Sequence, residues 1–172
     1  MSTLQQERLT TEAVSEETFD VFGIQLQFLV TPQQTNEQVS VYRGTIPPGV
    51  FIPLHSHAES EIFYVLDGAL EVFQGAGSAM GWSSIAPGRV VAIPGDRKHA
   101  LRNTSTRPTT VVLVTQNELY GFFRELAKPL SLGKPPAPPS PQEMQHLFAA
   151  AAKYHYWIGS PAENAEIGLS IG

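Results

Sequence analysis

Hydrophobic residues recur along the first two thirds of the chain in short runs that are broken by polar and turn-forming residues. The 14 glycines and 14 prolines punctuate these runs. Val39 and Val41 alternate with Ser40 and Tyr42, which is the period of a half-buried strand. Many short strands with turns at this spacing are typical of a β-sandwich or barrel. The segments that we expect to be strands are Phe19–Val30, Gln38–Ile46, Glu61–Leu66, Ala69–Phe73, Arg89–Ile93 and Thr109–Gln116.

Two local signals refine this pattern. The Asp67-Gly68 pair stands between two expected strands and indicates a hairpin. Parity along 61–66 places Phe63 and Val65 on the same face as Glu61, and Tyr64 on the opposite face.

The last third of the chain changes to a helical period. An apolar face with helical spacing predicts a helix that ends before Pro129. The residues of this face are Leu119, Phe122, Phe123 and Leu126. Ser140, Pro141 and Glu143 form a capping-box start signal for a second helix. We therefore expect an all-β domain followed by two C-terminal α-helices, which pack on its outside or at a subunit contact.

The expected organisation has three parts. Residues 1–18 form an N-terminal segment, 19–116 a β-barrel, and 117–172 a helical C-terminal extension. A proline-rich spacer, 131–141, divides the extension because its composition suits neither a helix nor a central strand.

Composition and charge exclude several function classes. The 172 residues contain no cysteine, which removes disulfide scaffolds, thiol nucleophiles and thiolate metal sites. With 11 basic and 16 acidic residues the net charge is −5, and no basic cluster predicts nucleic-acid binding. The polar, acidic N-terminus lacks the features of a secretory signal, and no apolar run is long enough to span a bilayer. We expect a cytoplasmic protein with no nucleic-acid or membrane partner.

One cluster of residues carries candidate metal chemistry. His55 and His57 are two residues apart, so on a strand both side chains leave the same face and can share one ion. Glu61 follows after a short break in which the chain can turn back toward them. Glu59 is the rival carboxylate, and we favour Glu61. His99 comes about forty residues later, just after a Pro-Gly turn.

These segments resemble the two motifs of the cupin superfamily. The first motif matches at every position, namely Gly49, His55, His57, Glu61 and Gly68; the second matches at Gly88, Pro94, His99 and Asn103. Asp96 departs from the second motif, since the expected glycine stands one place early as Gly95; this departure concerns the local turn and not the ligand. The resemblance implies a double-stranded β-helix, the jelly-roll cupin barrel, with His55, His57, Glu61 and His99 as ligands.

A narrower resemblance concerns the tail. The segment 120–126, the spacer and the Ala-rich helix before Tyr154 are similar to the ends of small bacterial cupins of the quercetin 2,3-dioxygenase-like type. This resemblance implies an oxidoreductase that adds O₂ to a small aromatic or enol-type substrate, with Glu61 as both ligand and catalytic base. It also implies a homodimer.

Three imidazoles and one carboxylate suit one divalent transition metal ion, such as Fe, Mn, Ni, Cu or Zn, and leave a position open. A non-oxidative isomerase or lyase would use the same ligands, and a ligand-binding cupin without turnover is a third alternative. Tyr42, Phe51 and Phe63 are candidate substrate-binding residues, although core packing explains them equally well. We expect structural roles for Gly49, Gly68 and Asn103, and surface positions for His146 and His155.

Overall fold

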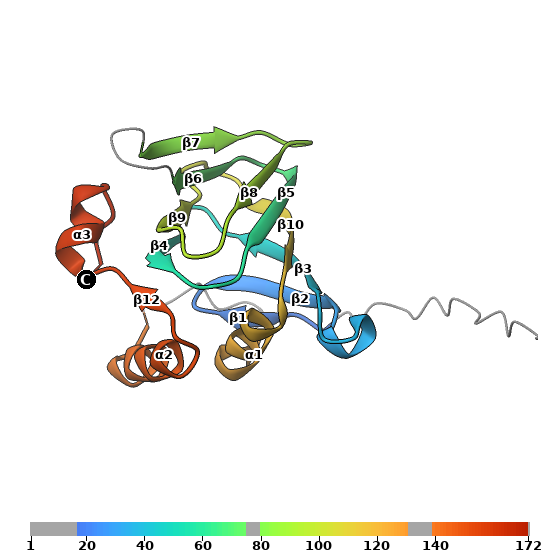
Figure 1. Cartoon of the computed structure of the whole chain (residues 1–172). Helices are drawn as coiled ribbons and strands as arrows, with labels where there is room; N and C mark the ends of the chain where they lie inside the picture. Colours follow the sequence, from blue (N-terminus) through green and yellow to red (C-terminus); the bar gives the residue numbers. More distant parts are fainter. Residues whose placement is uncertain (1–16, 75–79, 131–138, 172) are drawn as a thin grey trace, which may run out of the picture.

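The fold is built on two antiparallel β-sheets whose strands come from all parts of the chain (Figure 1). The computed structural model describes residues 17–74, 80–130 and 139–171. Most of the expected N-terminal segment and of the proline-rich spacer lies outside these described residues.

The larger sheet has seven strands in the order β11-β1-β2-β3-β10-β5-β8. Its strands are β1 (Phe19–Val21), β2 (Ile24–Val30), β3 (Ser40–Ile46), β5 (Glu61–Asp67), β8 (Val90–Ile93), β10 (Thr109–Thr115) and β11 (Lys128–Pro129). The smaller sheet has five strands in the order β12-β4-β9-β6-β7. They are β4 (Phe51–Ser56), β6 (Leu70–Gln74), β7 (Gly81–Ile85), β9 (His99–Arg102) and β12 (Trp157–Ile158).

Side chains from both sheets meet in one hydrophobic core. Val65 and Leu113 enter it from the larger sheet, and Val72 and Leu101 from the smaller one. Along β5 the buried residues alternate with exposed ones, so Glu61, Phe63 and Val65 point inward, as their parity predicts. Together the sheets form the jelly-roll type of β-fold that was expected.

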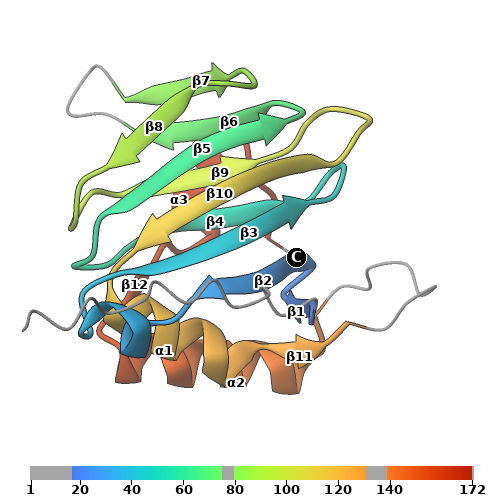
Figure 2. The same ribbon diagram turned by 90° about the vertical axis from the view of Figure 1, so that its right-hand side faces the viewer.

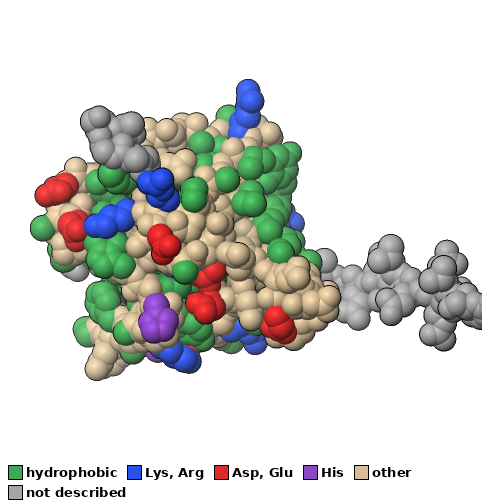
Figure 3. All heavy atoms as spheres, viewed as in Figure 1, with side chains coloured by type: hydrophobic (Ala, Val, Ile, Leu, Met, Phe, Trp, Pro, Cys, Tyr) green, Lys and Arg blue, Asp and Glu red, His purple; other side chains and the backbone are tan. Residues whose placement is uncertain are grey.

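The outer face of the larger sheet carries apolar side chains. Ile62 and Tyr64 of β5 are each 41% exposed, and Val90 of β8 is 59% exposed. Figure 3 shows hydrophobic side chains gathered over this side of the molecule. Alternation therefore divides β5 into an inner and an outer face, although the outer face is not polar.

The expected hairpin at Asp67-Gly68 is wrong. Gly68 does turn with a positive φ of 76°, but β5 belongs to the larger sheet and β6 to the smaller one. A Cβ on Gly68 would lie 2.7 Å from the Pro108 carbonyl oxygen, so this crossing between sheets requires glycine. The Asp-Gly signal marks the end of β5, but the next strand, β6, pairs within the smaller sheet.

The expected strand 19–30 is interrupted. Phe22 and Gly23 have φ values of 53° and 86° and form a tight turn, so the segment becomes the hairpin of β1 and β2. The amide of Gly23 donates to Oδ1 of Asp20 at 2.9 Å and closes this turn. Five further strands, β4, β7, β9, β11 and β12, lie outside the segments expected from the hydrophobic pattern; each of them is short or only partly buried.

Three α-helices occur among the described residues, one more than expected. They are α1 (Asn117–Leu126), α2 (Pro141–Lys153) and α3 (Pro161–Glu166), and a single 3-10 turn, η1, spans Pro32–Thr35. The capping box of α2 is confirmed, since Ser140 and Glu143 bond reciprocally. Ser160 and Glu163 repeat the same box at α3, so the sequence held a signal for this short helix.

Helices α1 and α2 lie side by side across the β1–β2 end of the larger sheet (Figures 1 and 2). Leu126 of α1 and Ala150 of α2 are buried and join the main core. This observation confirms packing on the outside of the β-domain. In the part of the chain that the structure describes, no helix has the length and apolar character needed to cross a membrane.

The C-terminal extension is attached to β4, the strand that carries His55. Ile158 of β12 pairs with His55 in antiparallel register. Asn164 of α3 is fully buried; its Oδ1 accepts from the Leu54 amide at 2.8 Å, and its Nδ2 donates to the carbonyl of Gly159 at 3.0 Å. One amide side chain therefore fixes the end of the chain against this strand.

We expect Asn164→Ala to lower the free energy of unfolding by about 2–3 kcal/mol, because it leaves the buried Leu54 amide and Gly159 carbonyl without this partner. Chemical denaturation measures the change. The exposed Glu166 on the same helix supplies the control, and Glu166→Ala should stay within about 0.5 kcal/mol of the parent protein. Equal stability of the two variants would contradict this role of Asn164.

Candidate metal centre

Three strands from both sheets bring the predicted ligands together. His55 lies on β4, and His57 follows that strand directly; Glu61 begins β5 and His99 begins β9. Strands β4 and β9 pair in a register that sets His55 opposite His99. The four residues are thus held by backbone pairing at strand ends.

One potential ligand atom from each of the four residues lies within 4.8 Å of all the others. Nε2 of His99 is 2.9 Å from Oε2 of Glu61, and Nε2 of His57 is 3.8 Å from the same oxygen. The ring centroids of His55 and His99 are 4.1 Å apart. Among the described residues this is the only such group, and Glu59 is not a member of it.

Two of the imidazoles are oriented by backbone carbonyls. Nδ1 of His55 is 2.7 Å from the carbonyl oxygen of Pro53, and Nδ1 of His99 is 2.8 Å from that of Arg97. Each carbonyl requires a proton on Nδ1, so Nε2 of a neutral ring keeps a free lone pair. That lone pair is what a metal ion binds.

Because the group is largely buried, the pKa values of His55 and Glu61 depend strongly on their ionisable neighbours. His57, Glu61 and His99 are each less than 5% exposed. Removal from water lowers the pKa of His55 to about 3, and the neighbouring His99 ring adds to this effect. Burial alone would raise the pKa of Glu61, but His57 and His99 outweigh it and hold the pKa well below its usual range. The carboxylate is therefore ionised beside imidazoles.

His57 shows the opposite shift. Burial alone would lower its pKa, but the carboxylates of Glu59 and Glu61 on either side raise it to about 9. Without a metal ion, the positive charge of protonated His57 thus offsets part of the negative charge of Glu59 and Glu61.

The residues fit a divalent metal ion. Both ring nitrogens of His57 are buried without any hydrogen-bond partner, a costly arrangement unless another group satisfies them. Three imidazole nitrogens and one carboxylate oxygen are the donors that first-row transition metals prefer, whereas calcium prefers oxygen ligands alone. This His/His/Glu/His group could hold a metal ion, whose identity its donors do not select.

The departure from the second motif at Asp96 leaves the site intact. A Cβ on Gly95 would lie 1.9 Å from the Ala58 carbonyl oxygen, so Gly95 is the position that needs glycine. Asp96 itself takes a φ of 61°, a conformation that aspartate tolerates better than most residues, and its amide donates to the His57 carbonyl at 2.7 Å. Asn103 is structural as expected, since its Nδ2 donates to the Ile46 carbonyl at 2.9 Å.

The candidate substrate-binding residues take different places. Tyr42 is fully buried and its hydroxyl donates to Ser40 at 2.7 Å; burial raises its pKa above the usual range. Phe63 is 4% exposed in the same core, and Phe51 is partly buried in a smaller cluster. Their role in substrate binding stays a prediction. His146 and His155 are exposed, as expected.

Two neighbours of the centre were not foreseen as a pair. The ring of Tyr156, which directly precedes β12, lies 4.9 Å from that of His57 between centroids, and Phe122 of α1 lies 4.5 Å from Tyr156. Both come from beyond the two motifs. The sequence alone had no signal for them, because their position depends on how the extension folds back.

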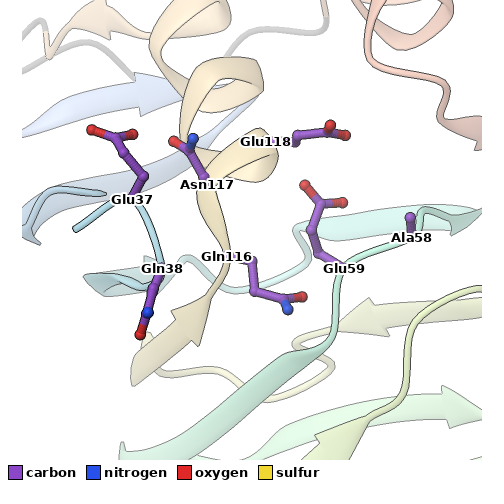
Figure 4. A pocket seen from close by; sticks show the side chains of 7 residues that line it. All are labelled: Glu37, Gln38, Ala58, Glu59, Gln116, Asn117 and Glu118. Carbon is purple, nitrogen blue, oxygen red and sulfur yellow. The ribbon is translucent and has the colours of Figure 1, made fainter. Parts of the chain in front are cut away.

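Glu59 lines a polar hollow of about 570 Å³ next to the centre (Figure 4). The other lining residues come from three segments and are Glu37, Gln38, Ala58, Gln116, Asn117 and Glu118. In Figure 4 the carboxylate of Glu59 points toward the first turn of α1, where Glu118 lies. Glu59 thus stands between this acidic hollow and His57.

Residues 42–115 match the family model of a cupin domain. No curated protein matches the sequence. Two solved structures of similar fold are a predicted oxalate decarboxylase from Thermotoga maritima and a cupin 2 conserved barrel domain protein from Salinispora arenicola. The first is 20% identical over 63% of this chain and 99% of its own, with a TM-score of 0.55. The second is 18% identical over 64% and 90% of the two chains, with a TM-score of 0.52.

A third structure, DMSP lyase DddQ from Ruegeria pomeroyi, is 25% identical over 48% of this chain, with a TM-score of 0.42. The match covers 40% of that lyase, so this chain spans less than half of its length. The domain match and the similar structures agree in showing a cupin-type fold over this part of the chain. They do not confirm the narrower resemblance to quercetin 2,3-dioxygenase-like proteins.

We expect His57→Ala to remove most of the bound metal while the fold is kept, because loss of a ligand affects metal affinity more than it affects the hydrophobic core. Metal content after equilibrium dialysis measures this loss. His146→Ala, on the exposed face of α2, is the matched control and should keep the parent metal content. A full metal equivalent in His57→Ala would contradict the site.

The two carboxylates are separated by a second pair of variants. Glu61→Gln should weaken metal binding more than Glu59→Gln, since only Glu61 belongs to the group of converging ligand atoms. A larger loss in Glu59→Gln would show that the choice between them is wrong.

Metal binding near pH 7 should release about one proton, because His57 is protonated below its raised pKa of about 9 and a protonated imidazole cannot coordinate. The apparent affinity should therefore rise from pH 7 to about pH 9 and then level off. Calorimetric titration with Zn²⁺ in buffers of different ionisation enthalpy counts the protons. Binding without proton release at pH 7 would contradict the charge state of His57.

Proposed function

From the match of residues 42–115 to the cupin domain, we propose that the protein is a metal-dependent cupin enzyme, a dioxygenase of a small aromatic or enol-type molecule. The observation that carries this proposal is the convergence of His55, His57, Glu61 and His99 on a common centre. A bound divalent transition metal would supply electron transfer to O₂ or polarisation of a substrate oxygen.

The chain's own residues would prepare the substrate. Glu61 is ionised and buried, and it is the only carboxylate in the converging group. It can accept a proton from a substrate hydroxyl and so generate the electron-rich oxyanion that oxidation requires. The low exposure of the centre excludes water, which strengthens each electrostatic interaction within it.

Aromatic side chains next to the centre support a planar substrate. The ring of Tyr156 lies against that of His57, and Phe122 lies against Tyr156, so ring surfaces adjoin the outer side of His57. Rings of this kind stack on aromatic or conjugated molecules with little loss of side-chain entropy. The imidazoles and the carboxylate of the centre are polar. They match a substrate that carries hydroxyl or carbonyl groups on a conjugated frame.

The decisive measurement is O₂ consumption by protein loaded in turn with Fe²⁺, Mn²⁺, Ni²⁺ or Cu²⁺, against flavonols, catechols and diketones. We expect substrate-dependent O₂ uptake with at least one ion and substrate class. Glu61→Gln should lower the rate by about 10²- to 10⁴-fold, the range for loss of a general base. His146→Ala, which changes an exposed imidazole far from the centre in sequence, should not change the rate.

Other outcomes would refute the oxidative proposal. Product formation at an equal rate under nitrogen would identify a non-oxidative isomerase or lyase that uses the same four ligands. Tight binding of a small molecule without product, for every ion, would identify a ligand-binding cupin.

A further inference from the structure

The three imidazoles of the centre differ in what holds their outer nitrogen. His55 and His99 each direct Nδ1 at a backbone carbonyl oxygen, at 2.7 and 2.8 Å. His57 has no such carbonyl, and its Nδ1 is buried without a hydrogen-bond partner. Its Nε2 faces Glu61, so Nδ1 is the nitrogen that points out of the centre.

Glu59 lies on that outer side of His57. Its Oε2 is 3.6 Å from Nδ1 of His57, a few tenths of an ångström beyond hydrogen-bond length. Glu59 is only 6% exposed, and its Oε1 has no hydrogen-bond partner. A buried carboxylate with an unpaired oxygen next to a buried unpaired nitrogen is costly, unless the two groups interact when the site is in use.

The C-terminal extension approaches the same carboxylate. The hydroxyl of Tyr156 is 3.5 Å from Oε2 of Glu59, and its ring lies against that of His57. Tyr156 is fixed by its backbone, because its amide donates to the Ala151 carbonyl at 2.8 Å and the next two residues pair with β4. Oε2 of Glu59 therefore has two potential donors near it, Nδ1 of His57 and the hydroxyl of Tyr156.

We propose that Glu59 is a positioning residue for the metal centre, which holds Nδ1 of His57 so that Nε2 faces the ion, and that Tyr156 of the C-terminal extension holds Glu59 in turn. This inference rests on the metal centre of the proposed function. Glu59 does not touch the ion. It acts through the imidazole, in the place that backbone carbonyls take for His55 and His99.

The arrangement has a measurable consequence. A carboxylate that accepts a hydrogen bond from the outer nitrogen of a metal-binding histidine fixes the ring and strengthens its coordinating nitrogen. Loss of such a partner usually costs about 10- to 100-fold in metal affinity. The extension would thereby influence the centre without supplying a ligand.

The test compares Zn²⁺ affinity, measured by competition with a chromophoric chelator, in the full-length protein and its variants. Glu59→Ala should weaken Zn²⁺ binding about 10- to 100-fold. Glu59→Gln keeps an oxygen that can accept from Nδ1, so it should restore part of this loss. Glu118→Ala is the matched control, because it removes another carboxylate from the same hollow without approaching His57, and it should change the affinity less than about twofold.

Tyr156→Phe removes only the hydroxyl and should give a smaller loss than Glu59→Ala, whereas Tyr154→Phe should give none. The visible absorption of the Co²⁺-loaded proteins provides a second readout. Its ligand-field bands should shift in Glu59→Ala and stay unchanged in Glu118→Ala, because only the first variant frees the His57 ring. If Glu59→Ala fails to fold, Glu59→Gln and Tyr156→Phe still give the test.

A Zn²⁺ affinity of Glu59→Ala within about twofold of the parent value would overturn the role of Glu59. If Glu59→Ala does not fold, affinities this close to the parent value for both Glu59→Gln and Tyr156→Phe would overturn it. An equal loss in Glu118→Ala would also overturn it, since the effect would then be that of net charge. Failure of the parent protein itself to bind any divalent ion would refute the metal centre and the proposed function together.

Discussion

The pairing of β4 with β9 is the constraint on which the site depends. This register sets His55 opposite His99, and the tight turn after His57 returns the chain so that Glu61 can start β5 in the other sheet. Gly95 fits against the Ala58 carbonyl oxygen where a side chain could not, which keeps the turn before His99 close to the one after His57. The ligands therefore converge because backbone hydrogen bonds fix their strands, and side-chain contacts only complete the geometry.

Burial then determines the charge states of the groups that lie close together. In water, imidazoles and a carboxylate at these distances would interact weakly, because solvent screens them. Inside the fold the neighbouring groups lower the pKa of Glu61 and raise that of His57, so before a metal binds an ionised carboxylate lies beside a protonated imidazole. A cation that replaces this proton meets donors that are already oriented and free of competing water.

The sequence predicted the parts of this molecule that depend on local patterns. Parity on β5 identified which residues face inward, and the capping box at Ser140 located the start of α2. The spacing of His55, His57 and Glu61 correctly predicted that they lie together. The hairpin at Gly68 was wrong because a turn residue reveals a change of direction but not which strand becomes the next partner. Tyr156 was missed for the same reason, since its position next to His57 is set by the pairing of β12 with β4.

The C-terminal extension is connected to the centre in two ways that differ physically. Its backbone adds β12 to the edge of β4, and Asn164 bonds to the amide of Leu54 on the same strand, so the extension stiffens the strand that carries His55. Its side chain Tyr156 reaches Glu59 and the ring of His57. Because one short segment contacts both histidines of the first motif, any shift of β12 along β4 would change the orientation of two ligands at once. The extension is thus placed to act on the geometry of the centre, since its backbone and its buried Asn164 bond to the strand that carries His55.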